Sequence, residues 1–186
     1  MRFRRYAVCA LAAAVVGLTL AAPATTAEAS SRVLTARDAA EPGLVGRIND
    51  VRAAHGLHRL RVSTRLTSAA TRHANSLATY AYFRHDLWTP KRVLDWTAFG
   101  TWVRWYYPGP GYTSWSAGEN LAWGAPDLSP RAAVVAWMNS PSHRDNLLHA
   151  GWRQVGVAIV HITNAGGYYG DFTDVTIVVA ELGQRR

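Results

Sequence analysis

Ser-Pro-Ser-His-Arg-Asp-Asn-Leu-Leu, residues 140–148, is the segment around which this chain is organised. A serine next to a proline, followed by polar residues and then by Leu147 and Leu148, predicts a helix N-terminus whose first turn carries His143. Such a first turn has unpaired backbone N–H groups. His143 is therefore either a cap or packed side chain, or one member of a functional site whose other members lie elsewhere in the chain.

Two amphipathic helices are predicted early in the chain. Apolar residues at helical spacing indicate the first over residues 44–54. Ser63 or Thr64 can cap the second, which runs to Tyr80 and buries one apolar stripe. His73 falls on that stripe, so we interpret it as a histidine at the core or at its edge.

Two more helices precede the central segment. Thr89-Pro90 indicates the start of a helix that includes Val93 and Leu94, because proline is favoured at the first helical position. Ser129 caps a later helix with Pro130 at that same position. This later helix leads directly into residues 140–148.

Strands are predicted around and after the last helices. Residues 116–124 form a strand-like run with a single carboxylate, Glu119. Val155, Val157 and Ile159 alternate with smaller residues, and the segment from Val175 to Leu182 is β-branched and apolar. The glycine-rich loop at residues 164–170 makes an antiparallel hairpin of the last two. Helices followed by a hairpin favour an α+β fold.

The N-terminus predicts export. Three arginines precede an uncharged run and an A-x-A site, so residues 1–29 read as a signal peptide cleaved after Ala29, or alternatively after Ala24. An uncleaved anchor is the other interpretation, although the run is shorter than a bilayer span requires. Cys9 would leave with the signal. We therefore expect a secreted, extracellular protein with no thiol, a flexible linker at residues 30–43 and one domain at residues 44–186.

The charge of the chain is basic. It contains 20 Lys and Arg and 12 Asp and Glu, and removing residues 1–29 leaves 17 basic and 11 acidic residues, a net charge of about +6. A basic exported protein meets anionic wall polymers or phospholipid headgroups first, although the charge can serve solubility alone. No nucleic-acid motif is present, so no specific nucleic-acid partner is expected. We expect a monomer without a transmembrane span once the signal is removed.

Aromatic residues are dense between residues 87 and 116, where five of the eight tryptophans lie. Such density either seals a core against water or lines a surface on which flat rings stack on sugars or acyl chains. Trp102 and Trp105 are the ligand-binding candidates under the second interpretation. Both interpretations stay open at the level of sequence.

His85, at the end of the second helix, and Glu119 are the two other candidate site residues. They and His143 are separated by 34 and 24 residues, so no local spacing brings them together. Four ordered segments supply that step by resemblance: Tyr-Phe-Arg-His at 82–85, Gly-Glu-Asn-Leu-Ala-Trp-Gly at 118–124, residues 136–148, and Val-Gly-Val-Ala at 155–158. Together they resemble the bacterial branch of the CAP superfamily, which includes the cysteine-rich secretory, antigen 5 and pathogenesis-related proteins.

The resemblance implies a three-layer α-β-α sandwich with a central antiparallel sheet, and a surface cleft where two histidines and two acids converge. His85, Glu119 and His143 match three of these positions, and Asn120 follows Glu119 in the Gly-Glu-Asn motif. The fourth position of the family pattern, the second acid, has no counterpart in this sequence, because residues 130–142 contain no acid. The disulfides of animal members are absent too.

This site has two functional interpretations. The first is a binding protein for an extracellular ligand, such as wall glycan, lipid or protein, that uses the His/Glu cleft together with Trp102, Trp105 and Asn120. The second is a secreted peptidase or esterase. His85 and His143, with Glu119 near, could then hold a divalent metal such as zinc, or Glu119 could activate water directly. A membrane-active defence protein is a third idea, and a non-enzymatic role is favoured overall.

Overall fold

The computed structural model describes residues 33–88, 96–107 and 109–186. The expected signal peptide at residues 1–29 and the expected helix around Val93 and Leu94 lie outside these residues. No helix in the described part of the chain combines the length and the apolar character needed to cross a membrane.

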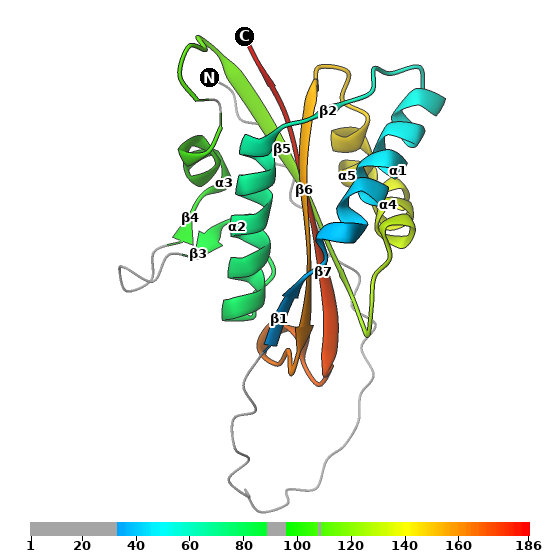
Figure 1. Ribbon diagram of the computed structural model, residues 1–186, viewed down its shortest axis with the longest axis vertical. Helices are drawn as coiled ribbons and strands as arrows, with labels where there is room; N and C mark the ends of the chain where they lie inside the picture. Colours follow the sequence, from blue (N-terminus) through cyan, green and yellow to red (C-terminus); the bar gives the residue numbers. More distant parts are fainter. Residues whose placement is uncertain (1–32, 89–95, 108) are drawn as a thin grey trace, which may run out of the picture.

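One antiparallel sheet runs through the centre of the molecule (Figure 1). Its main strands lie side by side in the order β1 (Val33–Ala36), β6 (Gln154–Thr163), β7 (Asp174–Arg185) and β5 (Trp115–Gly124). The short β2 (Arg61–Val62) pairs in parallel with the start of β6, and β3 (Leu87–Trp88) and β4 (Trp96–Thr97) form a separate small pair. The expected C-terminal hairpin is therefore β6–β7.

Helices cover both faces of this sheet. On one face lies α2 (Thr64–Tyr80), with α3 (Phe99–Trp102) beside it; on the other lie α1 (Glu41–Ala54), α4 (Pro130–Asn139) and α5 (Pro141–Leu147), as Figure 1 shows. Three single 3-10 turns complete the described elements: η1 (Asp38–Ala40), η2 (Val103–Trp105) and η3 (Gly167–Tyr169). The expected three-layer α-β-α sandwich is confirmed.

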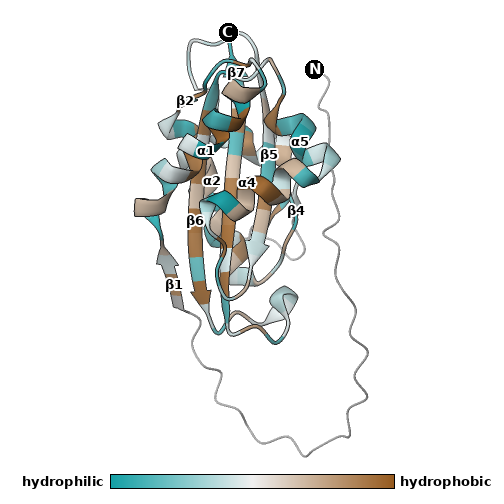
Figure 2. Cartoon of the chain, turned by 90° about the vertical axis from the view of Figure 1, so that its right-hand side faces the viewer, coloured by the Kyte–Doolittle hydropathy of each residue, from teal (hydrophilic) through white to brown (hydrophobic). Residues whose placement is uncertain are grey.

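The sequence pattern of the central strands explains this layering. Successive side chains of a strand point to opposite faces. In β7, Val179 packs into the cluster beneath α2, whereas Val178 and Ala180 pack into the cluster beneath α1 and α4. Strands covered on both faces are apolar throughout, and Figure 2 shows β6 as largely hydrophobic along its length.

Side-chain caps begin the two long helices whose starts were predicted from serine. The hydroxyl of Ser63 accepts a hydrogen bond from the backbone N–H of Leu66, 3.4 Å away, and the hydroxyl of Ser129 accepts one from Ala132 at 3.2 Å. Each satisfies one N–H group that a helix N-terminus otherwise leaves unpaired. Ser63 rather than Thr64 is thus the cap of α2.

The folded part of the chain begins earlier than the sequence suggested. Residues 33–36, expected within a flexible linker, form β1 and pair with Val160–Thr163 of β6, and α1 begins at Glu41 rather than at Leu44. β1 lies at the edge of the sheet and is held by backbone hydrogen bonds to β6. The sequence reading averaged residues 30–43 as a polar linker and so overlooked the short apolar run Val-Leu-Thr-Ala at 33–36.

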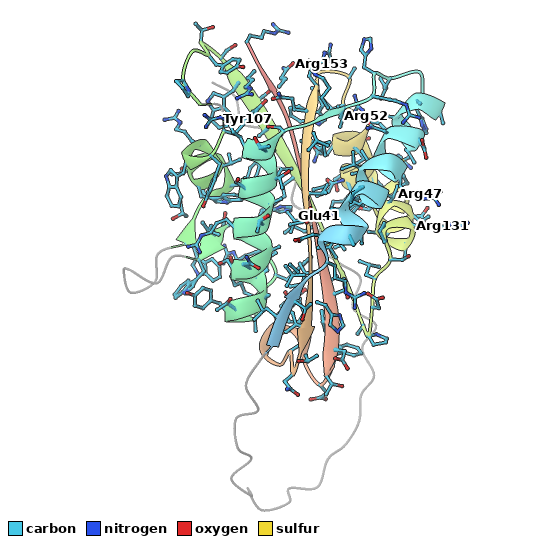
Figure 3. All side chains as sticks on the ribbon, viewed as in Figure 1. Glu41, Arg47, Arg52, Tyr107, Arg131 and Arg153 are labelled. Carbon is cyan, nitrogen blue, oxygen red and sulfur yellow. The ribbon has the colours of Figure 1, made fainter. Side chains whose placement is uncertain are left out.

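Arg52 ties the helices of one layer together. It points from α1 toward the end of α5 (Figure 3), and its guanidinium donates to the backbone oxygens of Leu147, His149 and His58 at 2.8, 3.2 and 3.0 Å. The side chain is completely buried. Because α5 carries His143, this contact also fixes one side of the candidate site.

Candidate functional site

β5 carries the central residue of the site. It is the last strand of the sheet, so only one of its edges pairs with another strand among the described residues. Its side chains alternate: Glu119 and Leu121 face α2, and Asn120 and Ala122 face α4 and α5. Groups from both helical layers can therefore approach one another around this strand.

Glu119 accepts hydrogen bonds from two histidines. Nδ1 of His73, in α2, lies 2.5 Å from Oε2, and Nδ1 of His85 lies 2.7 Å from Oε1. The carboxylate and His73 are buried, whereas 27% of the His85 side chain is exposed. Since an ionised carboxylate can only accept, each Nδ1 carries the shared hydrogen. His85 thus presents its other ring nitrogen, Nε2, for contacts beyond the site.

The electrostatics of this trio favour an anionic Glu119. Burial alone would raise the pKa of Glu119, but the charge of His73 and the hydrogen bonds from His73 and His85 outweigh it and lower that pKa from 4.5 to about 2. Burial alone would lower the pKa of His85, but its hydrogen bond with Glu119 and the nearby negative charge raise it above 6.5. Glu119 is therefore a weak base, and His85 holds its proton to higher pH than a free imidazole.

His143 reaches the same place from the opposite layer. It lies in the first turn of α5, as predicted, and its backbone oxygen accepts a hydrogen bond from the amide of Asn120 at 3.0 Å. Burial, reinforced by the positive charge of His85, lowers the pKa of His143 to about 4. The site therefore combines an imidazole that favours its charged form with one that favours its neutral form. His73, His85, Glu119 and His143 are called the histidine site below.

A second carboxyl lies beside Glu119. Glu181 of β7 is the direct cross-strand partner of Glu119 and is completely buried. Burial and the negative charge of Glu119 raise the pKa of Glu181 well above its ordinary value. One ligand atom each from His73, Glu119 and Glu181 lies within 4.8 Å of the others, so this buried group could hold a metal ion.

Comparisons with known proteins show the family of this chain. A model of the CAP family, described as the cysteine-rich secretory protein family, matches residues 45–180. The chain belongs to the CAP family. It is 31% identical over 137 residues to the uncharacterized protein YkwD of Bacillus subtilis (strain 168), and the match covers 73% of this chain and 47% of YkwD. The chain thus spans about half the length of that relative.

Solved structures share the CAP fold of this chain. An outer surface protein from Borrelia burgdorferi matches with a TM-score of 0.60 and 22% identity over 78% of this chain and 92% of that one. An extracellular protein containing an SCP domain, from Bacillus anthracis str. Ames, matches with a TM-score of 0.57 and 24% identity over 78% of this chain and 40% of that one. These neighbours are thus described as extracellular or outer surface proteins.

The three candidate ligand-binding residues, Trp102, Trp105 and Asn120, differ in their exposure to solvent. Trp102 has no exposed surface: its ring lies 4.9 Å from that of His73, and its indole N–H donates to the backbone oxygen of His85 at 3.1 Å. Trp105 is 56% exposed. Asn120 is buried and bridges His143 to Asn146, whose amide donates to it at 2.9 Å. Trp102 and Asn120 therefore support the site from within, and Trp105 alone of these three meets solvent.

Sequence reasoning missed two members of this cluster. His73 was interpreted as a core histidine, which its burial confirms, but its hydrogen bond to Glu119 was not foreseen. Glu181 was read only as part of an apolar strand. A signal did exist, because a carboxyl inside the run Val-Val-Ala-Glu-Leu is seldom buried without a partner. Its partner, however, lies 62 residues away and follows only from the strand register.

Proposed function

We propose that this CAP-domain protein is exported and binds an extracellular ligand through His85 and His143. The observation that carries the proposal is that both oxygens of Glu119 already accept an imidazole N–H. Glu119 therefore acts on His85 rather than on a ligand, and the groups left to meet a ligand are two imidazoles. A carboxylate whose oxygens are both occupied is poorly placed to act as a general base, so this arrangement favours ligand binding over base catalysis by Glu119.

Charge indicates the class of ligand. His85 favours its cationic form, and residues 30–186 carry a net charge of about +6 from 17 basic and 11 acidic residues. Both features favour a ligand with carboxylate or phosphate groups. Trp105, 56% exposed, offers a ring face for stacking on sugar units. An anionic wall glycan combines these two chemistries, so it is the ligand we propose, ahead of a lipid or a partner protein.

Co-sedimentation of residues 30–186 with purified wall glycan that carries phosphate groups tests the proposal. The wild-type protein should sediment with the glycan, and His85→Ala and His143→Ala should each lower the affinity at least about tenfold, the loss of roughly one charge-assisted hydrogen bond. His58→Ala is the matched control, since His58 is exposed and remote in sequence from the site. Equal binding by all four proteins, or binding only to anionic liposomes, would contradict the proposal.

A metal-assisted peptidase or esterase is the alternative function. Zinc-binding histidines commonly donate their second ring N–H to a carboxylate, as His85 does to Glu119. With His143 kept neutral and His85 giving up the proton on Nε2, His85 and His143 would be the ligands of a divalent metal such as zinc, with Glu119 behind His85. A metal so held would lower the pKa of a bound water to about 7. The chain's own part is to present both ring nitrogens and to keep Glu119 anionic.

Zinc titration calorimetry separates the two functions. The hydrolase predicts that zinc binds the wild-type protein, that His85→Ala and His143→Ala abolish this binding, and that the zinc-loaded protein turns over peptide or ester substrates. Turnover that survives His85→Ala, Glu119→Ala and His143→Ala alike would exclude a hydrolase at this site. Zinc binding without turnover would leave the metal as part of a ligand-binding site.

A further inference from the structure

A pocket at one end of the sheet is used by neither of the two functions. It lies where β5 begins and β7 ends, and its volume is about 120 Å³. Its lining comes from both strands and the residues next to them: Ser114, Trp115, Ser116, Gln184, Arg185 and Arg186. The backbone N–H groups of Thr113 and Ser114 both donate to the backbone oxygen of Arg186, at 2.8 and 3.2 Å. The two walls of the pocket are therefore fixed relative to each other.

The lining residues supply hydrogen-bond donors and no negative side-chain charge. A guanidinium has N–H groups and no acceptor, and serine hydroxyls and the amide of Gln184 can donate as well. The sequence has no Asp or Glu in residues 96–118 or 182–186, the segments that lead to this end of β5 and β7. The pocket therefore suits an anionic group.

Arg185 is held in place by two aromatic rings. Its guanidinium carbon lies 4.3 Å from the ring centre of Tyr112 and 5.3 Å from that of Tyr107. Tyr107, labelled in Figure 3, is itself fixed by a hydrogen bond from its hydroxyl to Gln154 at 2.8 Å. These cation–π contacts limit the movement of the guanidinium, so little further freedom is lost when its N–H fork binds an anion.

The arrangement favours a phosphate group carried on a sugar. The donors line the pocket from two strands, and a phosphate has three strong acceptor oxygens that point in different directions, whereas the two oxygens of a carboxylate lie in one plane. Trp115 is half-buried in the same lining, and an indole ring offers a flat surface on which a sugar ring packs. Phosphate and sugar together account for both kinds of lining residue.

We propose that this pocket is a second ligand site, in which Arg185 and Arg186 bind the phosphate of a phosphorylated sugar and Trp115 packs against the sugar ring. The pocket does not include the histidine site, although both lie along β5. Trp115 and Glu119 are four residues apart on the same face of that strand, a separation of about 13 Å. A phosphate-bearing glycan bound at the histidine site would extend along β5 to this pocket, and this last statement rests on the proposed function.

An NMR titration of the protein with glucose 6-phosphate, in a buffer free of phosphate and sulfate, tests the proposal. The indole N–H resonance of Trp115 and the side-chain amide resonances of Gln184 should shift and saturate. Inorganic phosphate should bind at least about threefold more weakly, because it lacks the ring that packs on Trp115. Glucuronate should also bind more weakly, because it carries a carboxylate in place of the phosphate.

Two variants test the arginines. Arg185→Gln and Arg186→Gln should each weaken the binding of glucose 6-phosphate at least about tenfold, the loss of one charge-assisted hydrogen bond. Arg131→Gln is the matched control, because it removes the same charge from an exposed position on α4, away from this end of the sheet (Figure 3), and should change the affinity less than about twofold. If Arg185→Gln disturbs the packing of Tyr107 and Tyr112, the exposed Arg186 decides alone.

Three results would overturn the proposal. Equal weakening by Arg131→Gln would show a general attraction of charge rather than a site. Inorganic phosphate or glucuronate binding as tightly as glucose 6-phosphate would exclude the sugar phosphate, and shifts limited to His85 and His143 would exclude the pocket. Glucose 6-phosphate is too small to span both sites. A protein that fails to bind wall glycan can therefore still confirm the pocket, and one that binds glycan through its histidines can still refute it.

Discussion

At the scale of single residues, two neighbouring tryptophans have opposite environments. Trp102 is buried against His73 and donates to the backbone oxygen of His85, whereas Trp105 is 56% exposed. We expect Trp102→Phe to lower the free energy of unfolding by about 2–3 kcal/mol, through a lost hydrogen bond and a smaller buried ring. Trp105→Phe should change it by less than about 0.5 kcal/mol. Urea denaturation measures both, and equal effects would contradict the assigned environments.

Glu119 makes the stability of the protein sensitive to acid. Its pKa falls from 4.5 in the unfolded chain to about 2 in the folded protein, because His73 and His85 stabilise the anion. A depressed folded pKa contributes stability that is complete above pH 4.5 and is lost as the pH falls toward about 2. We expect the urea midpoint of the wild-type protein to drop through this window.

Glu119→Gln isolates that contribution. The variant cannot ionise at position 119, so its midpoint should fall less steeply over the same window than that of the wild-type protein. Asp50→Asn, which removes an exposed carboxyl on α1, serves as the control. Parallel curves for the wild-type protein and Glu119→Gln would mean that Glu119 is not held as an anion in the folded state.

Individual site residues were only partly predictable from the sequence. The first-turn position of His143 follows from local helix signals, since serine and proline mark the start of α5. The contact between His85 and Glu119 does not follow from local signals, because it depends on how α2 and β5 pack. A resemblance to a known family supplied that contact as an expectation. The positions of Trp102, Asn120 and Glu181 around the site became clear only in the three-dimensional structure.

At the scale of elements, one glycine sets how closely α2 approaches the sheet. A Cβ on Gly156 of β6 would collide with the backbone of Leu66 and Thr67 in α2. Gly156→Ala should therefore push α2 away and cost more than about 3 kcal/mol, the upper range for overpacking, because the obstacle is backbone. Thermal unfolding with far-ultraviolet circular dichroism measures the cost.

Gly46 provides the matched control for that substitution. It lies within α1, and a Cβ there would meet nothing within 4 Å. Gly46→Ala should stabilise the protein by about 0.5–1 kcal/mol, because glycine lowers the stability of a helix interior. A similar loss of stability at both positions would mean that the contact between α2 and β6 is looser than described.

Helices were more predictable than strands at this scale. Serine caps and apolar stripes mark α2 and α4 locally, within a few residues of each helix start. The edge strand β1 carries no such mark, since its partner in β6 lies more than 120 residues away. The same separation hid the pairing of β5 with β7, from which the contact of the two glutamates follows.

At the scale of the whole molecule, Arg52 joins α1 to the end of α5. Its removal in Arg52→Met would leave the backbone oxygens of His58, Leu147 and His149 without this donor. Of the three bonds only the one to Leu147 is buried, and an unsatisfied buried group costs about 1–3 kcal/mol, so we expect a loss of about 1–3 kcal/mol in urea denaturation. Arg47→Met, at an exposed position of the same helix (Figure 3), should cost less than about 0.5 kcal/mol. A similar cost for both would contradict the link.

The molecule as a whole brings His85 and His143 from opposite helical layers to β5, where His85 bonds the buried carboxylate of Glu119 and the backbone oxygen of His143 is bonded by Asn120. His85 follows α2, His143 begins α5, and β5 between them carries Glu119. Composition and periodicity predicted an α+β chain, and they predicted neither the order of the strands nor the position of β5 at the sheet edge. The convergence of the site depends on that edge position, and so could not be predicted from local signals.

The pH titration of the histidine resonances by NMR tests this arrangement most directly. Because Glu119 stabilises the charged form of His85, while burial and the charge of His85 disfavour that of His143, the two must titrate apart. The predicted result is a pKa above 6.5 for His85 and a pKa of about 4 for His143. If both histidines titrated near 6.5, His85 would lack the support of Glu119 and His143 would not be buried beside a charged His85, and the account would be contradicted.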